Sequence, residues 1–185
     1  MSNFIILAVK NKRGDLDMQN HIWGKTLLSS YRFLERIAGA IDKIIEKKAL
    51  ASSWVTSASS MANSTLELAD KIIELSERKV KLINIKLLIE KALKKLDEKD
   101  AKILICKYFD KMGPEEIIAS FGLSRRSYFR RIQDAESSFE SSCASLGFPI
   151  SRLQTYLDSE DWMKQIAATF QAKQAKEKKG SALSI

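Results

Sequence analysis

Proline and glycine are scarce in this chain, with two prolines and seven glycines in 185 residues. These are the residues that most often interrupt helices and form tight turns. Strict alternation of apolar and polar residues, which would indicate strands, is absent except for a short run near the N-terminus. The sequence therefore predicts an all-α protein. An apolar content of 45% is enough for one moderate domain or two small ones.

Cysteine and histidine are also rare. Cys106 and Cys143 lie in no CxxC or Cys/His spacing, and His21 is the single histidine. Zinc sites and nucleophile–base pairs need such residues at defined spacings. The chain also has no phosphate-binding glycine loop and no nucleophile elbow. We therefore expect no metal, no cofactor and no enzyme activity.

Long hydrophobic runs are missing as well. No segment approaches the roughly 20 apolar residues that cross a bilayer, and residues 4–9 are too short for the core of a signal peptide. We expect a cytoplasmic protein without membrane contact. The net charge of +8 suits a polyanionic partner, although charge alone does not identify one.

The first 17 residues do not continue smoothly into the helical pattern of the rest of the chain. Residues 12–15, KRGD, can be encoded by a sequence containing GAGGTGAT, a strong bacterial ribosome-binding sequence at a suitable distance before Met18. Two interpretations stand with equal weight. Either residues 1–17 are an N-terminal arm upstream of the natural start at Met18, or they form a real strand or flexible arm of the protein.

Residues 18–95 carry two long apolar stripes with spacings of three and four, the period of an amphipathic helix. A serine-rich connection, residues 51–64, separates them. We expect a long antiparallel helical hairpin. The stripes present more apolar surface than two helices can hide from each other, so the hairpin is also a predicted interaction or oligomerisation surface. The first stripe is Leu27, Tyr31, Leu34, Ala38, Ile41 and Ile45, and the second is Leu68, Ile72, Leu75, Leu82, Ile85, Ile89, Leu93 and Leu96, which is the first residue beyond this range.

Residues 112–135 predict two short helices joined by a tight turn. Gly113 and Pro114 suit the start of the first helix, Gly122 suits the turn, and Ser124 suits the N-cap of the second. The second helix has an apolar stripe of Tyr128, Ile132, Ala135 and Phe139. Its other face contains Arg125, Arg126, Ser127, Phe129 and Arg130, flanked by Arg131 and Gln133.

This basic face has the properties of a DNA-recognition helix. Residues 123–133 contain four arginines and no acid. A helix about 10–12 Å wide fits the roughly 12 Å major groove, and arginine can pair with both acceptors of guanine. We expect Arg125, Arg126, Ser127 and Arg130 to contact base edges, Phe129 a thymine methyl group and Arg131 a phosphate, with Gln133 beside them. The alternative is a solvated helix surface, which would not require four arginines directly after a turn and an N-cap.

The segment from residue 96 to 139 resembles a known DNA-binding family. It begins LDEKDAKILICKYFD, continues with an EEI segment, and reaches a Gly-Leu-Ser turn followed by RRSYFRR. These features are similar to the promoter-binding domain (region 4) of sigma factors and to phage transcriptional regulators of the ArpU and RinA type. No part of the chain matches the core-polymerase-binding region of sigma factors. The resemblance implies a sequence-specific transcription regulator of phage or prophage origin, either sigma-like or a late-gene activator, that binds double-stranded promoter DNA.

The sequence leaves the partners and two other functions open. Two partners of the hairpin stay open: a second copy of the chain, which the apolar stripes favour, and RNA polymerase, which the resemblance implies. A small-terminase-like DNA-packaging adaptor and a purely protein-binding helical module are the other functions. The expected domains are the helix-turn-helix at residues 96–142, C-terminal helices at 143–172 and a basic disordered tail at 173–185.

Overall fold

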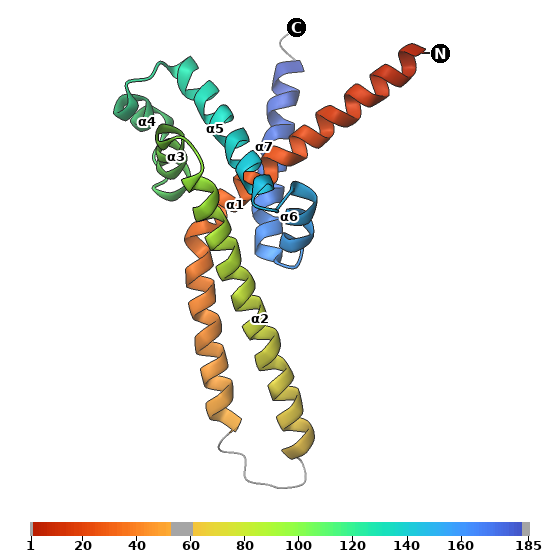
Figure 1. The fold of residues 1–185 in the computed structure, drawn as a ribbon, viewed down its shortest axis with the longest axis vertical. Coiled ribbons are helices and arrows are strands. Elements are labelled where there is room, and N and C mark those ends of the chain that lie inside the picture. Colours follow the sequence, from red (N-terminus) through yellow and green to blue (C-terminus); the bar gives the residue numbers. More distant parts are fainter. Residues whose placement is uncertain (1, 53–60, 183–185) are drawn as a thin grey trace. The chain divides into compact units, whose positions relative to one another are not determined.

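The computed structural model describes residues 2–52 and 61–182, and within these ranges the protein is all-α, as predicted (Figure 1). These residues form seven α-helices and one short π-helix, η1, and no strand. The elements are α1 (Ser2–Ser52), α2 (Met61–Lys94), α3 (Glu98–Leu104), η1 (Ile105–Phe109), α4 (Pro114–Phe121), α5 (Arg125–Ser145), α6 (Ile150–Leu157) and α7 (Asp161–Ala182). Most of the serine-rich connection predicted at residues 51–64 lies outside the described residues.

The helices pack as two compact units. The first combines Met1–Ser30 with Ile89–Ile185, and the second is Tyr31–Leu88. The division therefore falls inside α1 and α2, whereas the sequence pattern predicted that the hairpin is separated from the next domain after residue 95. The reason is that Leu27 and Leu28 of α1 and Ile89 and Ala92 of α2 belong to the buried set of the first unit.

The second unit is the predicted antiparallel hairpin. Lys79 of α2 pairs with Asp42 of α1 at 2.6 Å, and Lys86 pairs with Glu35 at 2.8 Å. The partner on α1 moves back seven residues when the lysine on α2 moves forward seven, so the two helices run in opposite directions (Figure 1). Between them lie the buried side chains of Leu34, Ala38, Ile41, Leu75, Leu82 and Ile85.

Two terminal segments differ from the expectation. Residues 2–17 belong to the continuous helix α1, not to a strand or a flexible arm. At the other end, α7 runs to Ala182, so the disordered tail expected from residue 173 is wrong up to that residue, and residues 183–185 lie outside the described residues. The segment AKQAKEKK consists of alanine, lysine, glutamine and glutamate, all strong helix formers, and this propensity outweighs its charge.

The helix α5 ends at Ser145, three residues beyond the domain boundary that we expected at residue 142. The predicted breakers act just beyond it. The N–H groups of Gly147 and Phe148 donate to the carbonyls of Ala144 and Cys143, and Gly147 has a φ of 86°. This left-handed glycine closes the helix C-terminus. Pro149 then provides the N-cap of α6.

The core of the first unit positions the predicted DNA-recognition helix. Ile103 and Leu104 of α3, Ile117 of α4, and Ile132 and Phe139 of α5 are all buried. They come from three consecutive helices, which gives the short α4 a fixed support. The first half of α5 is thereby held with one side against the core and the other exposed.

Candidate nucleic-acid interface

The helix-turn-helix begins with well-defined ends on α4. The N–H of Gly113 donates to Oε2 of Glu116 at 2.6 Å, and Pro114 occupies the first helical position. At the other end, Gly122 has a φ of 60°, and the N–H of Leu123 donates to the carbonyl of Ile118 at 3.0 Å. A left-handed residue at this position favours glycine, so the turn follows directly from the sequence.

The turn leads into α5 through a serine cap. Ser124 is extended, with a ψ of 155°, and its Oγ accepts a hydrogen bond from the N–H of Ser127 at 3.2 Å. The hydroxyl of Ser124 donates in turn to Oγ of Ser127 at 2.9 Å. Ser127, predicted to contact bases, is therefore half-buried and tied to the cap.

One stripe of α5 faces away from the core. Arg126, Phe129, Arg130 and Gln133 are all exposed and follow one another at positions i, i+3, i+4 and i+7, which lie on one helix face. We call these four residues the outer stripe. Phe129 is 54% exposed although it is a large aromatic residue. An exposed phenylalanine between two arginines gives the stripe both apolar and cationic contacts.

The four arginines of the cluster have different surroundings. Arg126 and Arg130 make no ion pair with any described residue. Arg125 lies 3.6 Å from Glu115, and both side chains are exposed. Arg131 is different, because its Nε lies 2.9 Å from Asp100 and its Nη2 lies 3.8 Å from Asp97.

The ion pairs of Arg131 link α5 to the start of α3. Asp97 is the N-cap of α3 and accepts a hydrogen bond from the N–H of Lys99 at 3.1 Å. The side chain of Arg131 is one-third exposed and that of Asp100 is 22% exposed. Arg131 thus has partners within the protein that the spacing of the sequence did not reveal. The structure does not test the phosphate contact predicted for this residue.

A hollow adjoins the outer stripe. It has a volume of about 390 Å³, and acidic as well as basic side chains line it. Two carboxylates, Asp100 and Asp134, and two guanidinium groups, Arg130 and Arg131, line it, so this side of the stripe has no net charge. The lining residues are Asp100, Leu123, Ser127, Arg130, Arg131 and Asp134.

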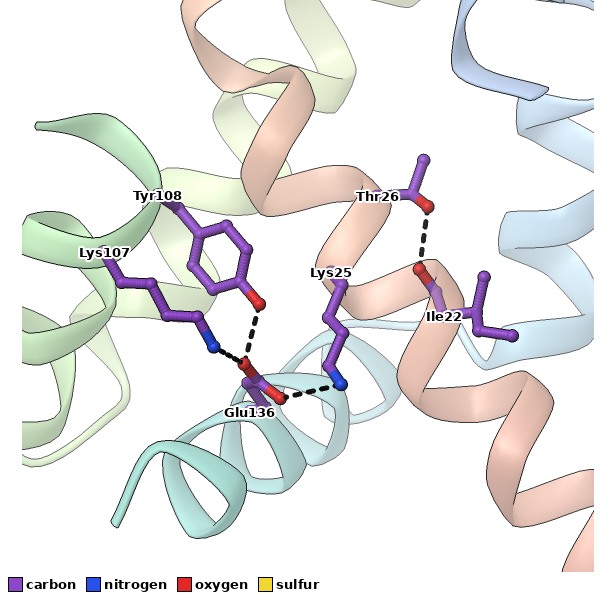
Figure 2. A network of polar contacts seen from close by, with 6 residues as sticks. All are labelled: Ile22, Lys25, Thr26, Lys107, Tyr108 and Glu136. Carbon is purple, nitrogen blue, oxygen red and sulfur yellow. Dashed lines mark hydrogen bonds and ion pairs between the residues drawn. The ribbon is translucent and has the colours of Figure 1, made fainter. Parts of the chain in front are cut away.

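A buried ionic network supports α5 from the core side (Figure 2). The carboxylate of Glu136 accepts hydrogen bonds from Nζ of Lys107 and the hydroxyl of Tyr108, both at 2.6 Å. Nζ of Lys25 lies 3.4 Å from the other oxygen of Glu136. The network therefore ties α1 and η1 to α5, and Lys107 and Tyr108 both reach it from the π-helix.

The network shifts the pKa values of its members in ways that follow from burial and charge. Burial would raise the pKa of Glu136, but Lys107, Tyr108 and Lys25 together hold it below its usual value. Burial lowers the pKa of Lys107 against the attraction of Glu136. Burial, with the charge of Glu136, raises the pKa of Glu140 to about 7. The pKa values of two neighbouring carboxylates on α5, Glu136 and Glu140, are thus shifted in opposite directions.

Sequence reasoning missed this network, although one signal of it was present. Glu136 lies one residue after Ala135 and three before Phe139, which places an acid at the edge of the apolar stripe of α5. A charged residue at that position needs a buried partner. Its partners, Lys25 and Lys107, are distant in sequence, so no local pattern identified them.

Membrane spans and metal clusters are both absent from the described residues. None of the described helices is long and apolar enough to cross a membrane. In the same part of the chain, no three histidine, cysteine, aspartate or glutamate side chains gather as a metal site would require.

A family profile described as a protein of unknown function (DUF1492) matches residues 54–140, a range that includes α2, α3, η1, α4 and the outer stripe. No curated protein and no solved structure matches the chain. The similarity thus joins the hairpin's second helix to the helix-turn-helix in one family region, and the description of that family names no activity.

Proposed function

We propose that the protein is a sequence-specific DNA-binding transcription regulator that reads promoter DNA with α5, the helix starting at Arg125. The observation that carries this proposal is the outer stripe. Arg126 and Arg130 are exposed without a carboxylate partner in the described part of the chain, on the second helix of a helix-turn-helix. This arrangement is the one in which a recognition helix meets base edges in the major groove.

Each residue of the outer stripe has a role that its chemistry supports. Arg126 and Arg130 each pair with the two acceptors of a guanine, and Gln133 pairs with adenine. Phe129 contacts a thymine methyl group. Arg125, at the N-terminal end of α5, reaches either a base edge or a phosphate once it leaves Glu115, because both side chains are exposed and the pair is weak.

Ser127 and Arg131 have supporting roles in this proposal. Ser127 shares the cap with Ser124, and Arg131 holds α5 against Asp100. Both interactions set the angle at which the outer stripe is presented. The proposal therefore differs from a uniform arginine patch, because only part of the cluster contacts DNA.

The class of regulator rests on the resemblance to sigma region 4 and to phage late-gene activators. In this proposal the protein binds double-stranded DNA, and the hairpin of the second unit meets either RNA polymerase or a second copy of the chain. Exposed apolar side chains on the hairpin support its use as an interface. The proposal assigns no catalytic residue and no cofactor.

The test begins with selection of bound duplexes from a random-sequence DNA library by the full-length protein. Binding of the selected duplex is then measured by fluorescence anisotropy over a series of salt concentrations. Arg126→Ala and Arg130→Ala should each weaken binding by about 1–3 kcal/mol and relax the preference at one base position. Lys173→Ala is the matched control, because it removes one exposed positive charge from α7, outside the outer stripe.

Three results would contradict the proposal in different ways. If the selection yields no preferred sequence, the protein does not bind DNA sequence-specifically. If the two arginine variants bind DNA as tightly as the Lys173→Ala control, the outer stripe is not the surface that contacts DNA. Large rings in sedimentation, combined with binding to DNA, would instead favour a DNA-packaging adaptor.

A further inference from the structure

The helix α2 carries a second apolar seam on the side that faces away from α1. Five large apolar side chains on it are 39% to 66% exposed, whereas the side chains that face α1 are buried. We call this line of residues the outer seam. Its members are Leu66, Ile73, Val80, Ile83 and Leu87, with the small residues Ala69 and Ser76 between them.

The outer seam has the spacing of a coiled coil. Leu66, Ile73, Val80 and Leu87 follow one another every seven residues, and Ala69, Ser76 and Ile83 lie three residues after the first three. Alternating steps of three and four residues place the a and d positions of a heptad along one line. The inner seam toward α1 already has its helix, so this second heptad line fits one additional helix.

The edges of the outer seam differ in charge. On one edge, the e positions are Asp70, Glu77 and Asn84, and the two acids make no ion pair with described residues. On the other edge, the g positions include Lys79 and Lys86, whose charges are already paired with Asp42 and Glu35 of the same hairpin. The seam is therefore apolar with one acidic edge and one neutralised edge.

This charge pattern disfavours a second copy as the occupant. In an antiparallel pair of seams, the e positions of the two helices face each other, which brings Asp70 close to the Glu77 of the other copy. In a parallel pair, the e positions face g positions, here Thr65 and Ile72, which cannot neutralise them. Neither arrangement pairs the acidic edge with a base, and like charges across such a contact are destabilising.

We infer that the outer seam of α2 binds one amphipathic helix of a partner protein, with large apolar residues at its a and d positions and lysine or arginine along the edge that meets Asp70 and Glu77. Large partner side chains fill the space above Ala69 and Ser76. This inference does not depend on DNA binding. It assigns the hairpin to a heterologous partner and not to self-association.

The probe for this test is a synthetic peptide of about four heptads with leucine at a and d and lysine at e and g, and a matched peptide with glutamate at e and g. Like charges at these positions keep each peptide from pairing with itself. Anisotropy of labelled peptides measures binding to the full-length protein. The protein should bind the lysine peptide at least about tenfold more tightly than the glutamate peptide. The net charge of +8 would by itself favour the opposite order, so this preference reports the local acidic edge.

Three protein variants make the test specific. Val80→Glu places a charge in the middle of the outer seam and should weaken binding of the lysine peptide at least about tenfold, although an exposed position tolerates the change. Ile44→Glu is the matched control, because Ile44 is an exposed apolar residue of α1 outside the seam, and it should bind like the parent. The double variant Asp70→Lys with Glu77→Lys should reverse the preference between the peptides.

Reversal of the preference by the charge-swapped variant supports the inference, whereas an unchanged preference overturns it. Equal binding by the Val80→Glu variant and the parent also overturns it, because the peptide would then bind elsewhere. Sedimentation decides the remaining alternative, since a dimer of the parent that Val80→Glu dissociates would assign the seam to a second copy.

Discussion

Glu136 offers the sharpest test of how the first unit holds α5. Glu136→Gln keeps the size and shape of the side chain and removes its charge. Its carboxylate is 5% exposed and accepts two hydrogen bonds at 2.6 Å, from Lys107 and Tyr108. The substitution removes the carboxylate with which Lys107 and Lys25 form ion pairs in a partly buried place.

The size of the effect follows from this geometry. Breaking a fully buried ion pair costs about 3–5 kcal/mol. Lys107 and Lys25 keep 29% and 24% of their surface exposed, so water can replace part of the lost interaction. We therefore expect a loss of about 2–3 kcal/mol in the free energy of unfolding at pH 7. A domain with a stability of about 5–15 kcal/mol would lose a large fraction of it.

The pH dependence gives the prediction a second, independent signature. The pKa of Glu136 is lower in the folded protein than its usual value of 4.5, so the network stabilises the folded state fully above that value. The stabilisation is lost as the pH falls below 4.5 and through the folded pKa. The difference between the parent and the Gln variant should therefore be larger just above pH 4.5 than in stronger acid.

Urea unfolding followed by circular dichroism at several pH values measures both signatures. Glu98→Gln is the matched control, because Glu98 forms an exposed ion pair with Lys102, and its loss should leave the unfolding midpoint unchanged. A Glu136 variant with the stability of the parent at pH 7, or with a deficit that stays constant into acid, would refute the reasoning. The network would then contribute no net stability to the fold.

Three further predictions concern the same helix. Burial and the charge of Glu136 raise the pKa of Glu140 to about 7, so the parent should lose stability as the pH rises from 4.5 to about 7. Glu140→Gln should remove this loss, and urea midpoints at the two ends of that window measure it. Ile132 is 5% exposed, so Ile132→Ala should cost about 2–5 kcal/mol, and a parental melting temperature would exclude it from the core. Arg131→Ala should cost about 1 kcal/mol of stability by the loss of the pair with Asp100 and leave the salt dependence of DNA binding unchanged. A salt slope reduced by about one unit would show instead that Arg131 contacts phosphate.

The parts of the fold that depend on local chemistry could be predicted from the sequence. The period of the apolar stripes predicted the hairpin, and Gly113, Pro114, Gly122 and Ser124 predicted where α4 begins and ends and where α5 begins. Each of these residues acts on its own backbone or on a neighbour within four positions. Helix caps and turns need no information from the rest of the chain, so short motifs report them accurately.

The parts that depend on distant contacts could not be predicted in this way. The π-helix η1 contains no proline or glycine that would mark it. It brings Lys107 and Tyr108 to a carboxylate 28 or 29 residues further along the chain. The division of α1 and α2 between two units is also invisible in their sequences, because the apolar stripes continue through the boundary without a change of period. Each end of an apolar stripe belongs to the unit whose other helices pack against it, and the sequence of the stripe does not contain that information.

The arginine cluster shows why this distinction matters for function. Arg126, Arg130 and Arg131 are the same residue type within six positions of one helix, and spacing assigned all of them to DNA. In the folded chain Arg131 has the carboxylate of Asp100 at 2.9 Å, while Arg126 and Arg130 have no such partner among the described residues. A contact between α3 and α5 makes this difference, and the sequence of α5 does not contain it. The number of arginines in a predicted recognition helix is therefore an upper limit on the number that are exposed without a carboxylate partner, and the acids in the preceding helices decide which of them are paired.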